Sequence, residues 1–274
     1  MIVHLIDGTY ELFRHFYGIR RFKKTDPPFG AVVGVLQTVA KMLEDGATHI
    51  GVATDHVIES FRNGLWPGYK TGAGIEPVLR AQFLPLEEAL AAMGVTVWPM
   101  IELEADDALA SAAHLAAVDE RVQKVCIWTP DKDLAQCVVG QRVVQVDRRS
   151  GQIRDADAIR AKYGVAPTNI PDYLALVGDA ADGYPGIAGY GAKTAARLIN
   201  LYGRLEDFPL DMLKDANLES ALLFKNLATL RTDAPLFGDV DQLRWRGATD
   251  SFGKMAAKIG AASLATRVRD LKTT

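Results

Sequence analysis

The chain has 274 residues, of which 49% are hydrophobic and 24% are charged, and its formal net charge at pH 7 is −3. These values are typical of a globular protein with one large domain or two modest ones, and no apolar run approaches the ~20 residues that span a membrane. A net negative charge, if spread evenly, argues against a nucleic-acid partner. We expect a cytoplasmic monomer without membrane contact. Cys126 and Cys137 are expected to be buried free thiols, because neither stands in a metal-binding spacing.

The first half of the chain alternates short apolar runs with helical patterns. The apolar runs predict strands at residues 2–6, 49–53, 95–98, 125–128 and 142–146. Amphipathic spacing predicts helices at residues 9–17, 31–43, 77–93, 104–118 and 156–163. Strands and helices in this order predict an α/β fold with a mostly parallel sheet flanked by helices.

Acidic residues follow three of the predicted strands. Asp7 and Asp55 come at the ends of the first two strands, and Asp131 and Asp133 follow the strand at 125–128. Open parallel sheets bind ligands beyond the carboxyl ends of their strands. We therefore expect these side chains to face one site.

A loop at residues 60–72 mixes aromatic and basic side chains, among them Arg62, Trp66, Tyr69 and Lys70. Such a loop is either an ordinary surface segment or a surface that stacks on bases and contacts phosphates. The sequence of the loop alone leaves both interpretations open.

The helix at 104–118 begins with Glu104, Asp106 and Asp107 and continues almost wholly in Ala and Leu. At about 100° per residue, the small apolar residues share one side, so the acids are expected to point away from the core of this helix. Acids in a first helical turn most often cap the helix and complement its dipole. A metal site is the alternative, and it requires other acids nearby.

From about residue 169 the pattern is helical, with no convincing strand until the tail. Helices are predicted at 172–177 and 192–201, joined by a segment that contains Gly186, Gly189 and Gly191. A glycine hairpin entering a helix N-terminus offers free N–H groups to a phosphate. Neither a P-loop nor a dinucleotide motif fits its spacing. The segment is either a device that grips a nucleic-acid backbone or a tight loop between packed helices.

The acids together predict a metal centre. If they met without cations, their mutual repulsion and desolvation would make the fold untenable. All-oxygen ligands indicate Mg²⁺ or Mn²⁺ ahead of zinc, and two such ions suit attack of water on a phosphodiester. The candidate acids number nine. Leaving their charges out changes the formal charge from −3 to +6, which is compatible with a cationic surface around an acidic pit. The candidates are Asp7, Asp55, Glu104, Asp106, Asp107, Asp131, Asp133, Asp179 and Asp182.

These motifs, in this order, resemble the 5′ nucleases of the flap endonuclease superfamily, particularly the 5′ to 3′ exonuclease domain of bacterial DNA polymerase I and its stand-alone relatives. The resemblance runs from Asp7 to about Tyr202 and is carried by Glu104-Ala105-Asp106-Asp107, Asp131-Lys132-Asp133 and Gly178-Asp179-Ala180-Ala181-Asp182 with Pro185-Gly186-Ile187. It implies a PIN-like nuclease domain at 1–165, with a helical arch at about 62–92. It also implies a helical DNA-binding region at 166–274, with a helix-three-turn-helix element at about 170–202.

The resemblance also implies roles for single residues. Asp7, Asp55, Glu104, Asp106 and Asp107 match ligands of a first metal, and Asp131, Asp133, Asp179 and Asp182 match ligands of a second. Lys70 and Arg62 match catalytic basic residues of the arch. DNA contacts are expected from Tyr69, Gly186, Gly189, Gly191, Lys193 and Thr194. The implied cofactors are two Mg²⁺ or Mn²⁺ ions, with K⁺ at the hairpin carbonyls.

The implied activity is metal-dependent 5′ to 3′ exonuclease and flap endonuclease action in replication or repair. The implied partner is DNA with a 5′ flap, a nick or a free 5′ end, and RNA primer strands are further candidates. Ala73 stands where an arginine is usual, and Gly183 where Asn is usual, so a DNA-binding module of low activity remains an alternative. A PIN-type ribonuclease is a third candidate, against which the hairpin at 186–194 speaks.

Overall fold

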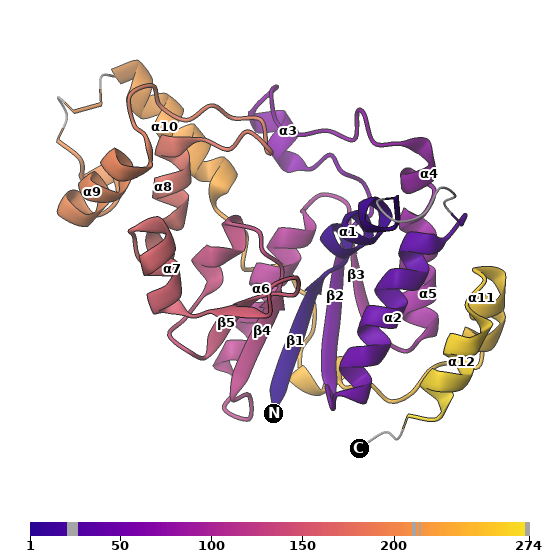
Figure 1. Ribbon diagram of the computed structural model, residues 1–274. Helices are drawn as coiled ribbons and strands as arrows, with labels where there is room; N and C mark the ends of the chain where they lie inside the picture. Colours follow the sequence, from indigo (N-terminus) through magenta and orange to yellow (C-terminus); the bar gives the residue numbers. More distant parts are fainter. Residues whose placement is uncertain (21–26, 210–211, 214, 272–274) are drawn as a thin grey trace.

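The computed structural model describes residues 1–20, 27–209, 212–213 and 215–271. At its centre lies a six-stranded sheet in the order β3-β2-β1-β4-β5-β6 (Figure 1). Strands β1 to β5 run parallel, and β6 pairs with β5 antiparallel. The strands are β1 (Ile2–Asp7), β2 (His49–Asp55), β3 (Thr96–Met100), β4 (Lys124–Trp128), β5 (Val143–Asp147) and β6 (Gln152–Arg154).

The strand order places a topological switch point between β1 and β4. The chain builds outward from β1 through β2 to β3 and then returns to the other side of β1 for β4. The connection that follows β1 and the connection that follows β4 run to opposite sides of the sheet, and this opens a crevice at the carboxyl ends of the two strands. The hydroxyl of Thr129, just after β4, donates to Asp7 at the end of β1 over 3.0 Å. The crevice is therefore lined by the ends of both strands.

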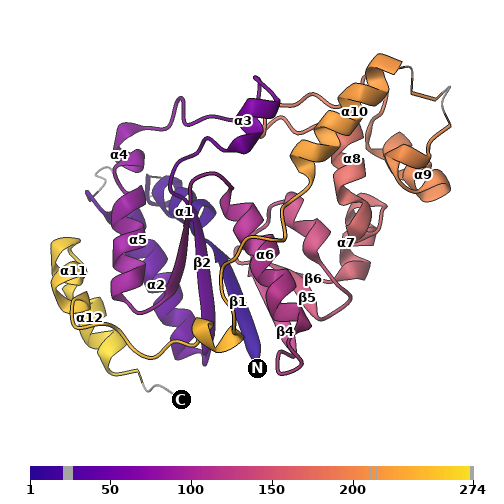
Figure 2. The same cartoon turned by 180° about the vertical axis from the view of Figure 1, so that it is seen from behind.

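Helices cover both faces of the sheet (Figures 1 and 2). Alternate residues of a strand point to opposite faces, so Ile6 packs on one side and Val3 and Leu5 on the other. The face of Ile6 is covered by α1 (Gly8–Arg20), α2 (Gly30–Glu44) and α5 (Phe83–Ala92). The opposite face is covered by α6 (Ala105–Val118).

The segment between β2 and β3 differs from its prediction. It contains α3 (Phe61–Leu65) within the predicted loop, and α4 (Pro77–Arg80) is separated from α5. At the break between α4 and α5, the Gln82 side chain accepts hydrogen bonds from the backbone N–H groups of Ala31 and Val32. These amides belong to the first turn of α2 and have no partner within their own helix.

The second half forms a helical unit beside the carboxyl edge of the sheet (Figure 1). Its core includes Leu174, Leu198 and Phe224. Its helices are α7 (Ala156–Tyr163), α8 (Ile170–Val177), α9 (Ala192–Tyr202) and α10 (Asp215–Ala228). In the described part of the chain no strand follows β6, and this includes the tail, for which the prediction leaves a strand open.

After α10 the chain returns to the sheet (Figure 2). It passes along α6, where the N–H of Ala234 donates to the hydroxyl of Ser111 over 3.1 Å. Then α11 (Phe252–Lys258) and α12 (Ala262–Arg269) join the core formed by α2 and α5. The last part of the region predicted at 166–274 thus packs on the α/β layers. Among the described residues, no helix combines the length and the apolar character needed to cross a bilayer.

Candidate metal centre

The predicted acids meet where β1, β2 and β4 end. Asp7, Asp55, Asp106, Asp131 and Asp182 line a cavity of about 390 Å³. Local backbone contacts fix two of these side chains. Asp7 accepts from the N–H of Tyr10 over 2.8 Å at the start of α1, and Asp55 accepts from the N–H of Ala105 over 2.8 Å at the start of α6.

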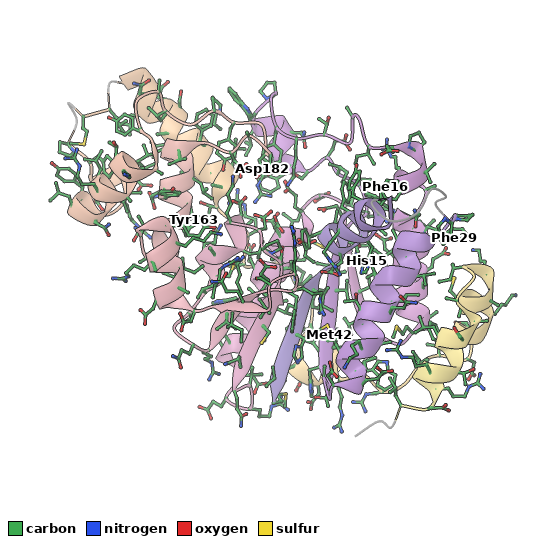
Figure 3. The ribbon with its side chains drawn as sticks, viewed as in Figure 1. His15, Phe16, Phe29, Met42, Tyr163 and Asp182 are labelled. Carbon is green, nitrogen blue, oxygen red and sulfur yellow. The ribbon has the colours of Figure 1, made fainter. Side chains whose placement is uncertain are left out.

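Two groups of carboxylates share Asp133, the first residue of a 3-10 helix that spans Asp133–Cys137. Oxygens of Asp106, Asp131 and Asp133 lie within 4.8 Å of one another, and oxygens of Asp133, Asp179 and Asp182 form the second group. Figure 3 shows Asp182 close to α3, at the end of the molecule to which the strands point.

Asp133 also supplies a direct test of whether cations fit this centre. Its Oδ1 atom is buried and has no hydrogen-bond partner among the described residues. A buried carboxylate oxygen without a partner is costly, and a cation would satisfy it. A donor set made only of carboxylates fits a divalent cation.

Crowding of like charges perturbs the titration of these acids. Burial, with added repulsion from Asp55 and Asp131, raises the pKa of Asp7 to about 7. Burial and the neighbouring Asp131 raise the pKa values of Asp106 and Asp133 well above the usual range. The cluster therefore favours protons or cations at neutral pH.

Two lysines supply positive charge within the cluster. Lys70 Nζ lies 2.8 Å from Glu104 and 3.0 Å from Asp182. Burial alone would lower the pKa of Lys70, but these two carboxylates raise it well above its usual value. Lys132 Nζ lies 2.7 Å from Asp179. Lys70 also lines the cavity.

The structure pairs Arg62, predicted as catalytic, with Asp107, predicted as a metal ligand. Asp107 is 0% exposed and Arg62 is 1% exposed, and the guanidinium donates to both carboxylate oxygens over 2.7 and 2.8 Å. The carboxylate also accepts from the N–H groups of Glu104 and Arg231, and Arg62 donates to the carbonyl of Leu227. Asp107 thus faces Arg62 and not the acid cluster, and Arg62 does not line the cavity.

Tyr69, predicted as a DNA contact, is buried. It is 3% exposed, because its ring packs inside the helical unit. Its hydroxyl donates to Glu104 over 3.3 Å. Glu104 accepts a further bond from the hydroxyl of Ser60 over 2.6 Å. Sequence reasoning missed Ser60, although the Ser60–Asn63 pair forms the capping box of α3 and its spacing is a recognisable signal.

The glycine hairpin joins α8 to α9, and its glycines have different roles. Gly186 has φ +70°, and an added Cβ would lie 2.5 Å from the carbonyl oxygen of Leu176, so this glycine permits close packing on α8. Gly189 has φ +90° and faces open space. Gly191 precedes the first turn of α9, where Lys193 is exposed and Thr194 is half-buried. Gly189, Gly191 and Lys193 are therefore accessible to a backbone phosphate.

Two family descriptions match consecutive parts of the chain. Residues 2–164 match "5′-3′ exonuclease, N-terminal resolvase-like domain", and residues 165–251 match "5′-3′ exonuclease, C-terminal SAM fold". A 5′-3′ exonuclease of Buchnera aphidicola subsp. Baizongia pistaciae is 33% identical over 248 residues, which cover 84% of this chain and 81% of the relative. DNA polymerase I of Pseudomonas aeruginosa is 34% identical over 259 residues, which cover 87% of this chain but 28% of the polymerase.

Solved structures share the fold at lower identity. The T5 5′-exonuclease with bound divalent zinc ions has 21% identity and a TM-score of 0.62, covering 99% of this chain and 98% of its own. The catalytic core of Rad2 in complex with a DNA substrate has 14% identity and a TM-score of 0.59, covering 98% and 92%. These likenesses confirm the predicted nuclease fold. With a family match over more than half of its length, the chain belongs to the 5′-3′ exonuclease family.

Proposed function

We propose that the protein is a metal-dependent 5′ to 3′ exonuclease and structure-specific flap endonuclease that hydrolyses DNA phosphodiesters in replication or repair. The observation that carries this proposal is the sharing of Asp133 between two groups of carboxylates at the carboxyl edge of the sheet. Two adjacent groups of oxygen ligands suit a pair of Mg²⁺ or Mn²⁺ ions. The name of the Buchnera relative, a 5′-3′ exonuclease, supports the same activity.

The carboxylates would hold the cations in two overlapping sets. Asp106, Asp131 and Asp133 would hold one ion, and Asp133 with Asp179 and Asp182 would hold the other. Asp7, Asp55 and Glu104 add negative charge around them. When bound, such ions supply the positive charge that activates water and stabilises the leaving oxygen in phosphodiester hydrolysis.

The remaining walls of the cavity would position the phosphate. Lys70 would donate to a phosphate oxygen, since its ammonium group lies beside Glu104 and Asp182 and Lys70 lines the cavity. Phe13, Ile58 and Ile75 form an apolar wall that would exclude water from the reacting group. Lys70 therefore orients the substrate, and the apolar wall limits the access of solvent.

The hairpin supports DNA as the substrate. Open backbone at Gly189 and Gly191 and the exposed Lys193 would grip phosphates without reading bases. The Rad2 core, which shares the fold, was solved with a DNA substrate. We propose DNA with a 5′ flap, a nick or a free 5′ end as the partner, with K⁺ at the hairpin carbonyls.

Cleavage of a 5′-labelled flap substrate tests this proposal. We expect cleavage with Mg²⁺ and none with EDTA. Asp133→Asn should reduce the rate on the order of 100-fold or more, because it removes a charge from both carboxylate sets. Asp157→Asn is the matched control, since Asp157 is an exposed acid on α7 away from both sets.

Each alternative has its own outcome in the same assay. Absence of metal-dependent cleavage contradicts the proposal. Tight DNA binding with turnover unchanged by Asp133→Asn would indicate a DNA-binding module. Preference for single-stranded RNA over branched DNA would indicate a PIN-type ribonuclease.

A further inference from the structure

Two loops that carry different parts of the candidate metal centre are joined directly. The loop at residues 66–70 ends in Lys70, and the loop at residues 178–184 contains Asp179 and Asp182. The N–H of Lys70 donates to the carbonyl of Asp182 over 3.0 Å. The indole N–H of Trp66 donates to the carbonyl of Gly183, also over 3.0 Å.

Two glycines allow this close approach. Gly183 has φ +84°, and an added Cβ would overlap the carbonyl oxygen of Gly68. A Cβ on Gly68 would lie 2.7 Å from the indole nitrogen of Trp66 and 3.2 Å from the carbonyl oxygen of Gly183. A side chain at either position would therefore force the loops apart, and a residue other than glycine at position 183 would also be strained.

Aromatic packing holds Trp66 in place. Its ring packs edge-on against Phe224 of α10 with centroids 5.4 Å apart, and Phe224 stacks on Tyr184 at 5.5 Å. Tyr184 closes the second loop through paired backbone hydrogen bonds with Asp179 over 2.8 and 3.0 Å. The indole thus has a fixed orientation, with its N–H directed at Gly183.

The metal centre needs such a constraint. Asp179 and Asp182 belong to the same carboxylate group as Asp133, and like charges at this separation repel. A flexible loop would relax by moving its two acids outward. Cations would then have to restore the spacing, at the expense of binding free energy.

We infer that Trp66, Gly68 and Gly183 hold the two loops together and so position Asp179 and Asp182 for metal binding. We call these three residues the latch. The latch also fixes the position of Lys70 relative to the two acids. This inference rests on the proposed function, because the latch acts through the metal centre. Trp66 is a positioning residue, since neither its ring nor its N–H lines the cavity. The base of the arch and the second carboxylate group therefore move as one body.

Mn²⁺ binding without DNA, measured by titration calorimetry on the full chain, tests the latch. Trp66→Phe keeps an aromatic ring against Phe224 and removes only the donor to Gly183. We expect it to weaken Mn²⁺ binding about 2- to 10-fold, the ratio that corresponds to one net hydrogen bond. Gly183→Ala should weaken binding more than about tenfold, because strain and overlap add to that loss.

Gly46→Ala is the matched control for backbone strain. Gly46 has φ +94°, lies at the end of α2, and an added Cβ there meets nothing within 4 Å. The Gly46→Ala variant should bind Mn²⁺ with the same affinity as the wild type. In cleavage assays, Trp66→Phe should raise the Mg²⁺ concentration needed for half-maximal rate, with KM for DNA unchanged at saturating Mg²⁺.

The outcomes separate this inference from the proposed function. If Trp66→Phe and Gly183→Ala bind Mn²⁺ as tightly as the wild type, the latch is refuted and the nuclease proposal stands. A wild-type chain that binds no Mn²⁺ and cuts no flap refutes both. If Gly183→Ala does not fold, as judged by thermal unfolding, Trp66→Phe alone decides.

Discussion

Replacing Arg62 with leucine removes one half of a fully buried ion pair. Asp107, 0% exposed, then retains only the N–H donors of Glu104 and Arg231, and the carbonyl of Leu227 loses its donor as well. Loss of one partner from a buried pair costs about 3–5 kcal/mol, because the remaining charge stays buried without compensation. For a chain of this size, we expect a fall in Tm of roughly 5–9 °C.

The assay is thermal and urea unfolding in EDTA at pH 7, followed by circular dichroism. Arg62→Lys should be intermediate in stability, since an ammonium group cannot reproduce the two parallel bonds to Asp107. Adding Asp107→Leu to Arg62→Leu should restore part of the loss, because neither charge then remains. Arg160→Leu, at an exposed position on α7, is the control and should change stability little.

The result that would refute this reasoning combines two measurements. It is a stability loss below about 1 kcal/mol for Arg62→Leu together with a large fall in the rate of flap cleavage. Arg62 would then act on the substrate, as the family resemblance implies, and not on the fold.

Three further predictions concern the acids and the hairpin. Asp106→Asn should raise the Tm in EDTA by a few degrees, since it relieves the burial of a charge and its repulsion from Asp131. The same change should abolish cleavage. An unchanged Tm would contradict the inferred repulsion among the acids. The pKa of Asp7 is raised to about 7, so its unfavourable contribution to stability is absent below about pH 4 and grows as the pH rises to 7. The gain in unfolding free energy from Asp7→Asn in EDTA should therefore increase from about pH 4 to pH 7. If the difference in unfolding free energy between variant and wild type stays constant over this range, the pKa of Asp7 is not raised. Lys193→Ala should reduce the slope of the logarithm of the DNA-binding constant against the logarithm of salt concentration by about one. An unchanged slope would show that Lys193 does not contact a phosphate.

Local sequence pattern was sufficient where the chemistry depends on strand ends. Asp7, Asp55 and Asp131 were expected to share a site because parallel strands end at a common edge, and they line one cavity. The predicted strands and the helix at 104–118 correspond closely to β1 to β5 and α6. Among the strands of the described residues, only the short antiparallel β6 was not expected.

Tertiary partners decided what the pattern could not. Helical periodicity placed Glu104, Asp106 and Asp107 together, but the structure directs Asp106 to the acid cluster and Asp107 to Arg62. That choice depends on residues 227–231, whose backbone contacts the same pair. No local signal links positions 62, 107 and 227, so the sequence alone could not separate the two acids.

The return of the chain after α10 has a consequence for how the protein folds. Trp245 donates its indole N–H to the carbonyl of Met93 over 2.9 Å, and Phe252, Leu264 and Val268 fill the core beside α5. During synthesis, the α/β half therefore emerges first with one apolar surface uncovered, and it stays so until α11 and α12 leave the ribosome. We expect limited proteolysis or truncation after α10 to yield an aggregating fragment and not a minimal nuclease, because α11 and α12 cover the apolar surface of α2 and α5.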